Sequence, residues 1–92
     1  MKEIRIDQPD WDTLEALGVF AWPILEHDPG TFECEYKKEE ICYMLEGKAR
    51  IEPKDKRKPV DFKKGDLVIF PEGLKCVWKI SKHVTKHFIV DE

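Results

Sequence analysis

The sequence predicts an all-β protein, a small sandwich or closed barrel of antiparallel strands with one short helix near the N-terminus. Apolar and polar residues alternate in short runs along most of the chain, as they do in strands with one buried face. Turn-forming glycine, proline and aspartate residues separate these runs at short intervals. In addition, 92 residues, of which 41% are hydrophobic, are enough for one core. We therefore expect a single domain over residues 1–92.

The composition argues against several classes of function. Sixteen basic and 19 acidic residues give a formal net charge of -3, whereas a nucleic-acid-binding protein needs a basic face to displace counterions. No apolar run reaches the roughly 18–20 residues that a membrane span requires, and the first residues lack the apolar middle of a signal peptide. We therefore expect a cytoplasmic protein with neither nucleic acid nor membrane as partner. Its three cysteines, without a Cys-x-x-Cys spacing, are expected to be free thiols.

The N-terminal part predicts one short strand and then the helix. Residues 2–6 alternate between polar and apolar side chains, which indicates a strand. Asp12 is followed three residues later by Glu15, a pattern that begins many helices. Gly18 is expected to end this helix after about two turns.

The rest of the chain predicts strands and turns. We expect strands at residues 21–27, 31–36, 41–46, 48–52, 60–62, 67–70, 75–80 and 84–90. The turns between them are marked by Asp-Pro-Gly at 28–30, by Gly47 and by Lys-Lys-Gly-Asp at 63–66. The lysine-rich run 54–58 is interpreted as a solvated hairpin tip.

The alternation also assigns side chains to the two faces of each strand. The side chains expected to face the interior are Phe32, Cys34, Tyr36, Cys76, Trp78, Ile80, Val84, Lys86, Phe88 and Val90. Among them Lys86 is an inward cation, which is unusual in a core.

Two stretches resemble the paired motifs of the cupin superfamily. In the first, Glu40 and Gly47 stand at the spacing of the glutamate and glycine that end that motif. The second motif is matched by Gly65, Pro71 and Gly73, which form the turns into and out of a strand. The resemblance implies a jelly-roll barrel, also called a double-stranded β-helix.

More narrowly, the chain is similar to the small single-domain cupins grouped with (S)-ureidoglycine aminohydrolase. The residues that carry this similarity are Gly30 to Phe32, Glu40 to Gly47, Lys64 to Asp66, Phe70 to Gly73, Trp78 and Lys86. It implies a compact barrel that forms a homodimer. Some of these cupins bind manganese and release ammonia from a ureido substrate.

The metal-binding positions of this chain depart from the usual cupin set of three histidines and a glutamate. They read Cys34 and Tyr36 (or Glu33 and Glu35 with the other allowed spacing), then Glu40 and Cys76. None of the three histidines, His27, His83 and His87, falls on a motif position. Cysteine and glutamate side chains are nevertheless possible zinc ligands.

The candidate site combines residues from several strands. Glu40 and Lys86 are the candidate catalytic residues; Cys34, Tyr36, Cys76, Trp78 and Phe88 are the candidate pocket; and Glu40 and Cys76 are the candidate metal ligands. Each has a simpler interpretation, because buried cysteines and aromatic side chains usually only fill a core. Glu40 and Lys86 are expected either to form a structural ion pair or to leave Lys86 to bind an anionic ligand.

Three functions remain open from the sequence. The first is a small-molecule-binding cupin without a cofactor, with Trp78 as a flat wall of its pocket. The second is an enzyme that uses zinc or manganese on a nitrogenous metabolite, as the ureidoglycine aminohydrolase resemblance implies. The third is a structural or regulatory protein that pairs with a second copy, for example through an edge strand at residues 2–6.

Overall fold

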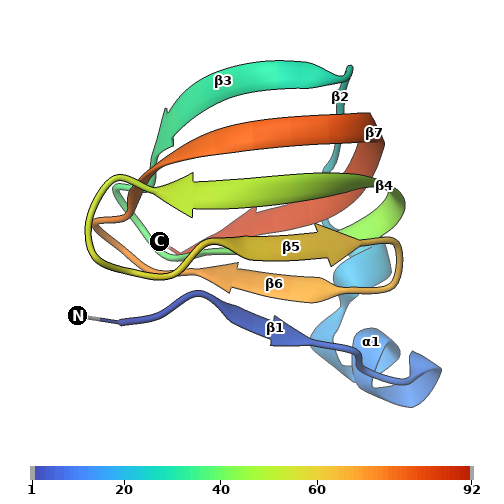
Figure 1. Cartoon of the computed structure of the whole chain (residues 1–92). Coiled ribbons are helices and arrows are strands. Elements are labelled where there is room, and N and C mark those ends of the chain that lie inside the picture. The colour runs from blue at the N-terminus through green and yellow to red at the C-terminus, as the bar shows by residue number, and fades with distance from the viewer. Residues whose placement is uncertain (1, 92) are drawn as a thin grey trace.

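The structure, a computed structural model, describes residues 2–91 and consists mostly of antiparallel strands (Figure 1). The strands are β1 (Arg5–Asp7), β2 (Ile24–His27), β3 (Gly30–Glu35), β4 (Glu40–Pro53), β5 (Val60–Lys63), β6 (Leu67–Phe70) and β7 (Lys75–Val90). A single α-helix, α1 (Trp11–Leu17), and a 3-10 turn, η1 (Val19–Ala21), lie between β1 and β2. The predicted all-β class with one short N-terminal helix is confirmed.

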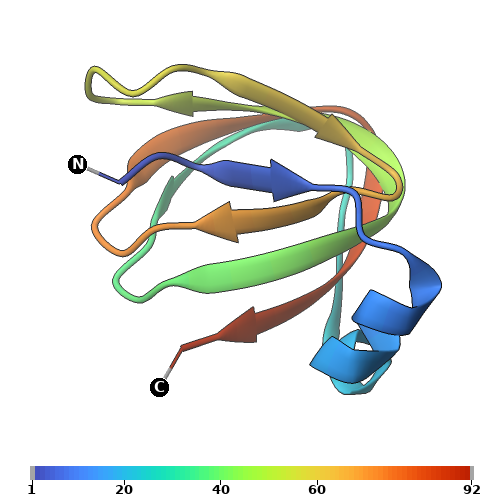
Figure 2. The same cartoon turned by 90° about the horizontal axis from the view of Figure 1, so that it is seen from below.

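Two long strands, β4 and β7, organise the whole barrel because each contributes to both of its halves. The first part of β4 pairs with β6 and with the end of β7, whereas its second part pairs with β5 and with the start of β7. β3 and β2 then extend β7 at its start and at its end, respectively. Figure 1 shows β3, β7, β4 and β5 side by side, and Figure 2 shows β1, β6 and the first part of β4 from below.

Gly47 lies where β4 bends from one half of the barrel to the other. The sequence predicted two strands separated there, but β4 is continuous, and its register with β7 shifts between Met44 and Ala49. Such irregularities are the usual way in which one strand turns a corner between sheets. Gly47 has a φ of 103°, and a Cβ at this position would lie 2.2 Å from the carbonyl oxygen of His83. Only glycine therefore allows β4 and β7 to approach so closely at the bend.

The same bend joins the two predicted C-terminal strands. Residues 75–80 and 84–90 belong to one strand, β7, which runs without interruption through residues 81–83. Those three residues are exposed, so they showed no alternation that indicates a strand. Their strand conformation comes from pairing with β4 rather than from burial.

The helix begins earlier than predicted. Asp10, not Asp12, caps α1, because its carboxylate accepts a hydrogen bond from the backbone N–H of Thr13 at 2.9 Å. Glu15 does not reach back to the helix start; it accepts a hydrogen bond from the indole of Trp11 instead, at 2.6 Å. Gly18 ends the helix in a left-handed conformation, as predicted.

The segment around the helix differs from its prediction at both ends. The strand expected at 21–27 is shorter, because η1 continues to Ala21 and β2 begins only after Pro23. Proline has no N–H for a strand ladder, which explains this late start. The first strand covers Arg5–Asp7 rather than residues 2–6. β1 is an edge strand, because it stands at one end of the strand order. Pairing with a second copy through this strand requires such an edge. The homodimer itself stays a prediction.

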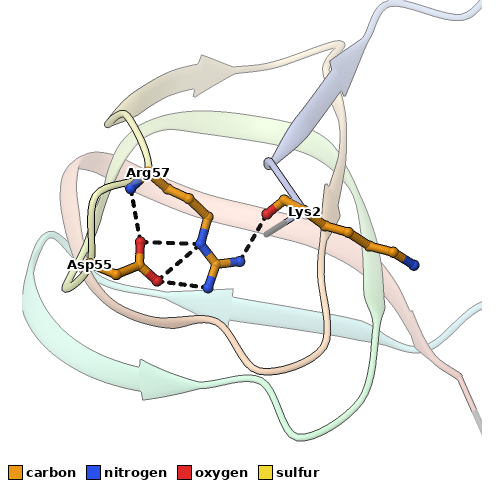
Figure 3. A network of polar contacts seen from close by, with 3 residues as sticks. All are labelled: Lys2, Asp55 and Arg57. Carbon is orange, nitrogen blue, oxygen red and sulfur yellow. Dashed lines mark hydrogen bonds and ion pairs between the residues drawn. The ribbon is translucent and has the colours of Figure 1, made fainter.

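The run 54–58 is only partly the solvated tip that the sequence predicted. Arg57 is buried, and its guanidinium makes an ion pair with Asp55 at 2.7 Å (Figure 3). It also donates a hydrogen bond to the carbonyl oxygen of Lys2 at 2.9 Å, which ties the N-terminal segment to this loop. The other charged residues of the run are exposed, as expected.

The core lies between the two halves of the barrel. Its fully enclosed large side chains are Trp78, Phe70, Met44, Ile51, Leu74, Val19, Val68, Val84, Cys42 and Cys76. Neither helical segment in the described part of the chain is long and apolar enough to cross a membrane.

Candidate functional site

The predicted alternation correctly placed the inward side chains of β3 and β7 except Val90, which is 39% exposed near the end of β7. Phe32 and Cys34 are partly buried and Tyr36 is buried, whereas Glu33 and Glu35 are exposed. On β7, the interior residues Cys76, Trp78, Ile80, Val84 and Lys86 are all buried. Side chains that are scattered along the chain thus share one interior, as the candidate site requires.

Lys86 is an almost completely buried cation. Its side chain is 4% exposed, and its Nζ lies 4.3 Å from the ring centroid of Trp78 and 3.9 Å from Oε2 of Glu40. The first contact is a cation–π interaction, and the second is an ion pair that is too long for a hydrogen bond.

Glu40 lies at the start of β4, opposite Val90 of β7 and Phe70 of β6. Its side chain is 18% exposed. Burial raises the pKa of Glu40 above its usual value, and the charge of Lys86 partly opposes this shift. Lys86 therefore favours the ionised form of Glu40, which burial disfavours.

We expect the variant Lys86→Met to be destabilised less in acid than at neutral pH. The loss of the cation raises the pKa of Glu40 further, because the effect of burial remains. A carboxyl whose pKa is higher in the folded than in the unfolded chain adds stability at low pH and loses it as the pH rises through the folded pKa. Urea unfolding at about pH 4 and about pH 7 measures this difference.

The double variant Lys86→Met/Glu40→Gln is the control for this prediction. It has no carboxyl at position 40, so the additional pH dependence of Lys86→Met should disappear. An equal loss of stability at both pH values in the single variant would show that Glu40 is ionised without help from Lys86.

Trp78 and Tyr36 form the buried floor of the site rather than a wall for a ligand. The indole Nε1 of Trp78 donates a hydrogen bond to the hydroxyl of Tyr36 at 2.9 Å. The ring of Trp78 is 1% exposed and is stacked against Phe32, with Phe62 meeting it edge-on. Burial raises the pKa of Tyr36. The partly exposed aromatic side chain at this site is Phe32, not Trp78.

Cys34 and Cys76 face each other across β3 and β7. The neighbouring Cys76 thiol lowers the pKa of Cys34, and the same interaction raises the pKa of Cys76. Tyr36 and Lys86 also lower the pKa of Cys34. The third cysteine, Cys42, is fully enclosed on β4, and burial raises its pKa to about 12.

His27 is a site residue that the sequence analysis missed. Its ring stacks on Phe32 with centroids 5.2 Å apart and lies 6.1 Å from the ring of Trp78. Burial and the charge of Lys86 lower the pKa of His27. It falls on no cupin motif position, and it reaches the site because β2 pairs with the end of β7. The only sequence signal for His27 was its position at the end of a predicted strand, which is a weak one.

The other two histidines and Phe88 lie as follows. His83 is exposed and contacts Glu26 and Asp28, and His87 is buried on the outer face, where its Nδ1 contacts the carbonyl oxygen of Trp22. Phe88 packs against the core in a partly buried position, two residues beyond Lys86 on the same face of β7.

The donor side chains do not fit a metal ion. Among residues 2–91, no three His, Cys, Asp or Glu side chains are gathered closely enough to hold one together. Glu40 belongs to the half of the barrel that contains β6, and Cys34 and Cys76 belong to the half that contains β3.

Two hollows on the barrel lie away from this site. One, of about 560 Å³, is lined by residues of β3, β4, β5 and β7, including the core residues Ala49, Phe62 and Ile80. The other, of about 680 Å³, is lined by Glu39, Ile41 and residues 89–91. Neither includes Glu40 or Lys86.

Comparisons with known proteins agree with the barrel. Residues 14–88 match the EutQ-like cupin domain. A DUF861 family protein from Thermotoga maritima has 40% identity and a TM-score of 0.93, over 97% of this chain and 100% of that one. No curated protein matches the chain significantly.

Two more distant structures show the fold alone. The EutQ protein of Clostridium difficile is 21% identical with a TM-score of 0.64, over 73% of this chain and 52% of its own. A putative ethanolamine utilization protein Q from Salmonella typhimurium is 19% identical with the same TM-score, over 73% of this chain and 53% of its own. The chain thus spans about half the length of each of these two proteins.

Proposed function

The chain belongs to the family of EutQ-like cupin domains, and from this membership we propose that it is a small-molecule-binding cupin whose ligand is held by Lys86 and Glu40. One observation carries the proposal. Within residues 2–91, the buried ammonium of Lys86 has only a distant carboxylate and an aromatic face as partners. An ammonium carries three hydrogen-bond donors, so an anionic ligand group would gain charge-assisted hydrogen bonds that no side chain supplies.

The neighbouring side chains suggest the rest of the ligand. Glu40, when ionised, accepts hydrogen bonds, so it suits an N–H group of the ligand. Phe32 and His27 offer stacked, partly exposed rings beside Trp78. These features favour a small planar molecule with both an anionic group and N–H groups. Ureido carboxylates have this chemistry, in line with the resemblance to ureidoglycine aminohydrolase.

The alternative is a metal-dependent enzyme that acts on a nitrogenous metabolite, with Glu40 and Cys76 as ligands. The described donor side chains do not gather around one point, so we derive no step through a metal. Elemental analysis of protein grown with added zinc and manganese separates the two functions. A stoichiometric metal that is lost in Glu40→Gln would favour the enzyme.

We expect N-carbamoylglycine to raise the melting temperature of the protein. At about 100 times its Kd, a ligand of the folded state adds about 2.7 kcal/mol to the free energy of unfolding. For a domain of this size, each kcal/mol corresponds to a shift of about 4–8 °C. Acetate and urea, which carry the anionic and N–H parts separately, should each give a much smaller shift at the same concentration.

The matched controls are Lys86→Met and Lys82→Met. Both remove a lysine from β7, but Lys82 is exposed. The ligand-induced shift should be lost in Lys86→Met and kept in Lys82→Met, and Glu40→Gln should reduce it. Equal shifts in the two lysine variants, or no shift in the unmodified protein, would rule out this ligand site.

A further inference from the structure

Cys34 and Cys76 stand directly opposite each other in the antiparallel pair of β3 and β7, with both side chains on the interior face. Directly opposite residues in such a pair have Cβ atoms about 4.5–5.5 Å apart. A disulfide needs a Cβ separation of about 3.5–4.5 Å and Cα atoms about 4.4–6.8 Å apart. The two sulfurs can therefore bond after a small approach of the strands.

β3 is able to make that approach. Among the described strands it pairs only with β7, so no other strand holds it on its far side. Cys34 is partly exposed on this edge strand, whereas Cys76, beside it on β7, is fully enclosed. The pair thus combines one accessible sulfur with one protected sulfur.

We propose that Cys34 and Cys76 are a peroxide-sensitive pair in which Cys34 is oxidised first and Cys76 then closes a disulfide. The proposal does not depend on the ligand site, because it concerns only the two thiols.

Hydrogen peroxide is the oxidant, and the chemistry has two steps. The thiolate of Cys34 attacks one peroxide oxygen, so that an S–O bond forms, the O–O bond breaks, and hydroxide leaves to become water. The Cys76 sulfur then attacks the sulfenic acid, so that the S–S bond forms and the S–O bond breaks. The leaving hydroxide takes the proton of Cys76. Two thiols and one peroxide thus give one disulfide and two waters.

Cys42 is an internal control. It is fully enclosed, its register partners are Val68 and Phe88, and burial raises its pKa to about 12. It should therefore stay reduced when the other two cysteines react.

The test is to treat the reduced full-length chain with hydrogen peroxide, alkylate the remaining thiols in denaturant, and map them by mass spectrometry. We expect the loss of two hydrogens from the intact mass, a linked peptide that contains Cys34 and Cys76, and an alkylated Cys42. Dithiothreitol should restore all three thiols. In Cys76→Ser, Cys34 should instead stop at a sulfenic acid that dimedone traps, and Cys42→Ser should behave like the unmodified chain.

Three outcomes would overturn the proposal. The first is a disulfide that involves Cys42 or joins two chains. The second is the accumulation of sulfinic acid on Cys34 while Cys76 remains a free thiol. The third is a Cys34 that reacts with peroxide no faster than Cys42.

Discussion

Replacing Gly47 by alanine is expected to lower the free energy of unfolding by about 2–5 kcal/mol, the sum of about 1–2 for backbone strain and about 1–3 for overpacking. Gly47 has a φ of 103°, which L-residues rarely adopt. The new Cβ would lie 2.2 Å from the carbonyl oxygen of His83, and that oxygen belongs to the backbone. A side-chain rotation therefore cannot relieve the clash, and β4 and β7 must separate at the bend.

Gly65→Ala is the matched control for this prediction. Gly65 also has a positive φ, 92°, but nothing lies within 4 Å of its ideal Cβ position. This variant should therefore lose only the strain contribution, about 1–2 kcal/mol. Urea unfolding followed by far-UV circular dichroism measures both variants. Equal losses of stability in the two variants would show that the close approach of β4 and β7 adds nothing to the destabilisation of Gly47→Ala.

Replacing Trp78 by alanine is expected to cost about 3–5 kcal/mol, the usual range for a large aromatic residue in a core. Trp78 is 1% exposed, and its loss leaves a cavity among Phe32, Phe62 and Phe70. It also removes the donor to the Tyr36 hydroxyl and the aromatic face beneath Lys86. Trp78→Phe keeps an aromatic ring, so its free energy of unfolding should lie between those of the unmodified protein and of Trp78→Ala.

The same substitution at Trp11 is the control. Trp11 is 62% exposed and stacks on Phe20 with centroids 4.8 Å apart. Trp11→Ala should therefore cost at most about 1 kcal/mol. If the two alanine variants unfolded at the same urea concentration, Trp78 would not be the centre of the core.

The parts of the fold that were predicted correctly are those with a local signal. Strand β6 has the predicted bounds, residues 67–70, because a continuous apolar run lies between two turn signals. Gly18 ends the helix because its left-handed conformation suits glycine. The inward position of Lys86 followed from alternation alone.

The errors occurred where a contact that the pattern does not reveal, either local or tertiary, outweighs the expected one. Asp12 and Glu15 have the spacing of a capping box, but Trp11 binds Glu15, and Asp10 caps the helix. Arg57 stands in a highly charged run, and nothing in that run indicates that its guanidinium is buried against Lys2 and Asp55.

The sequence by itself determined the strands, most of the turns and which side chains face inward, because the alternation of buried and exposed residues is a property of each strand alone. Only the tertiary structure decided that β4 and β7 are continuous through the bend. It also decided that the charged groups of Glu40 and Lys86 lie 3.9 Å apart and that the ring of His27 stacks on Phe32. Pairing between distant strands fixes those distances, and the register of each pair depends on the partner strand as much as on the residues themselves.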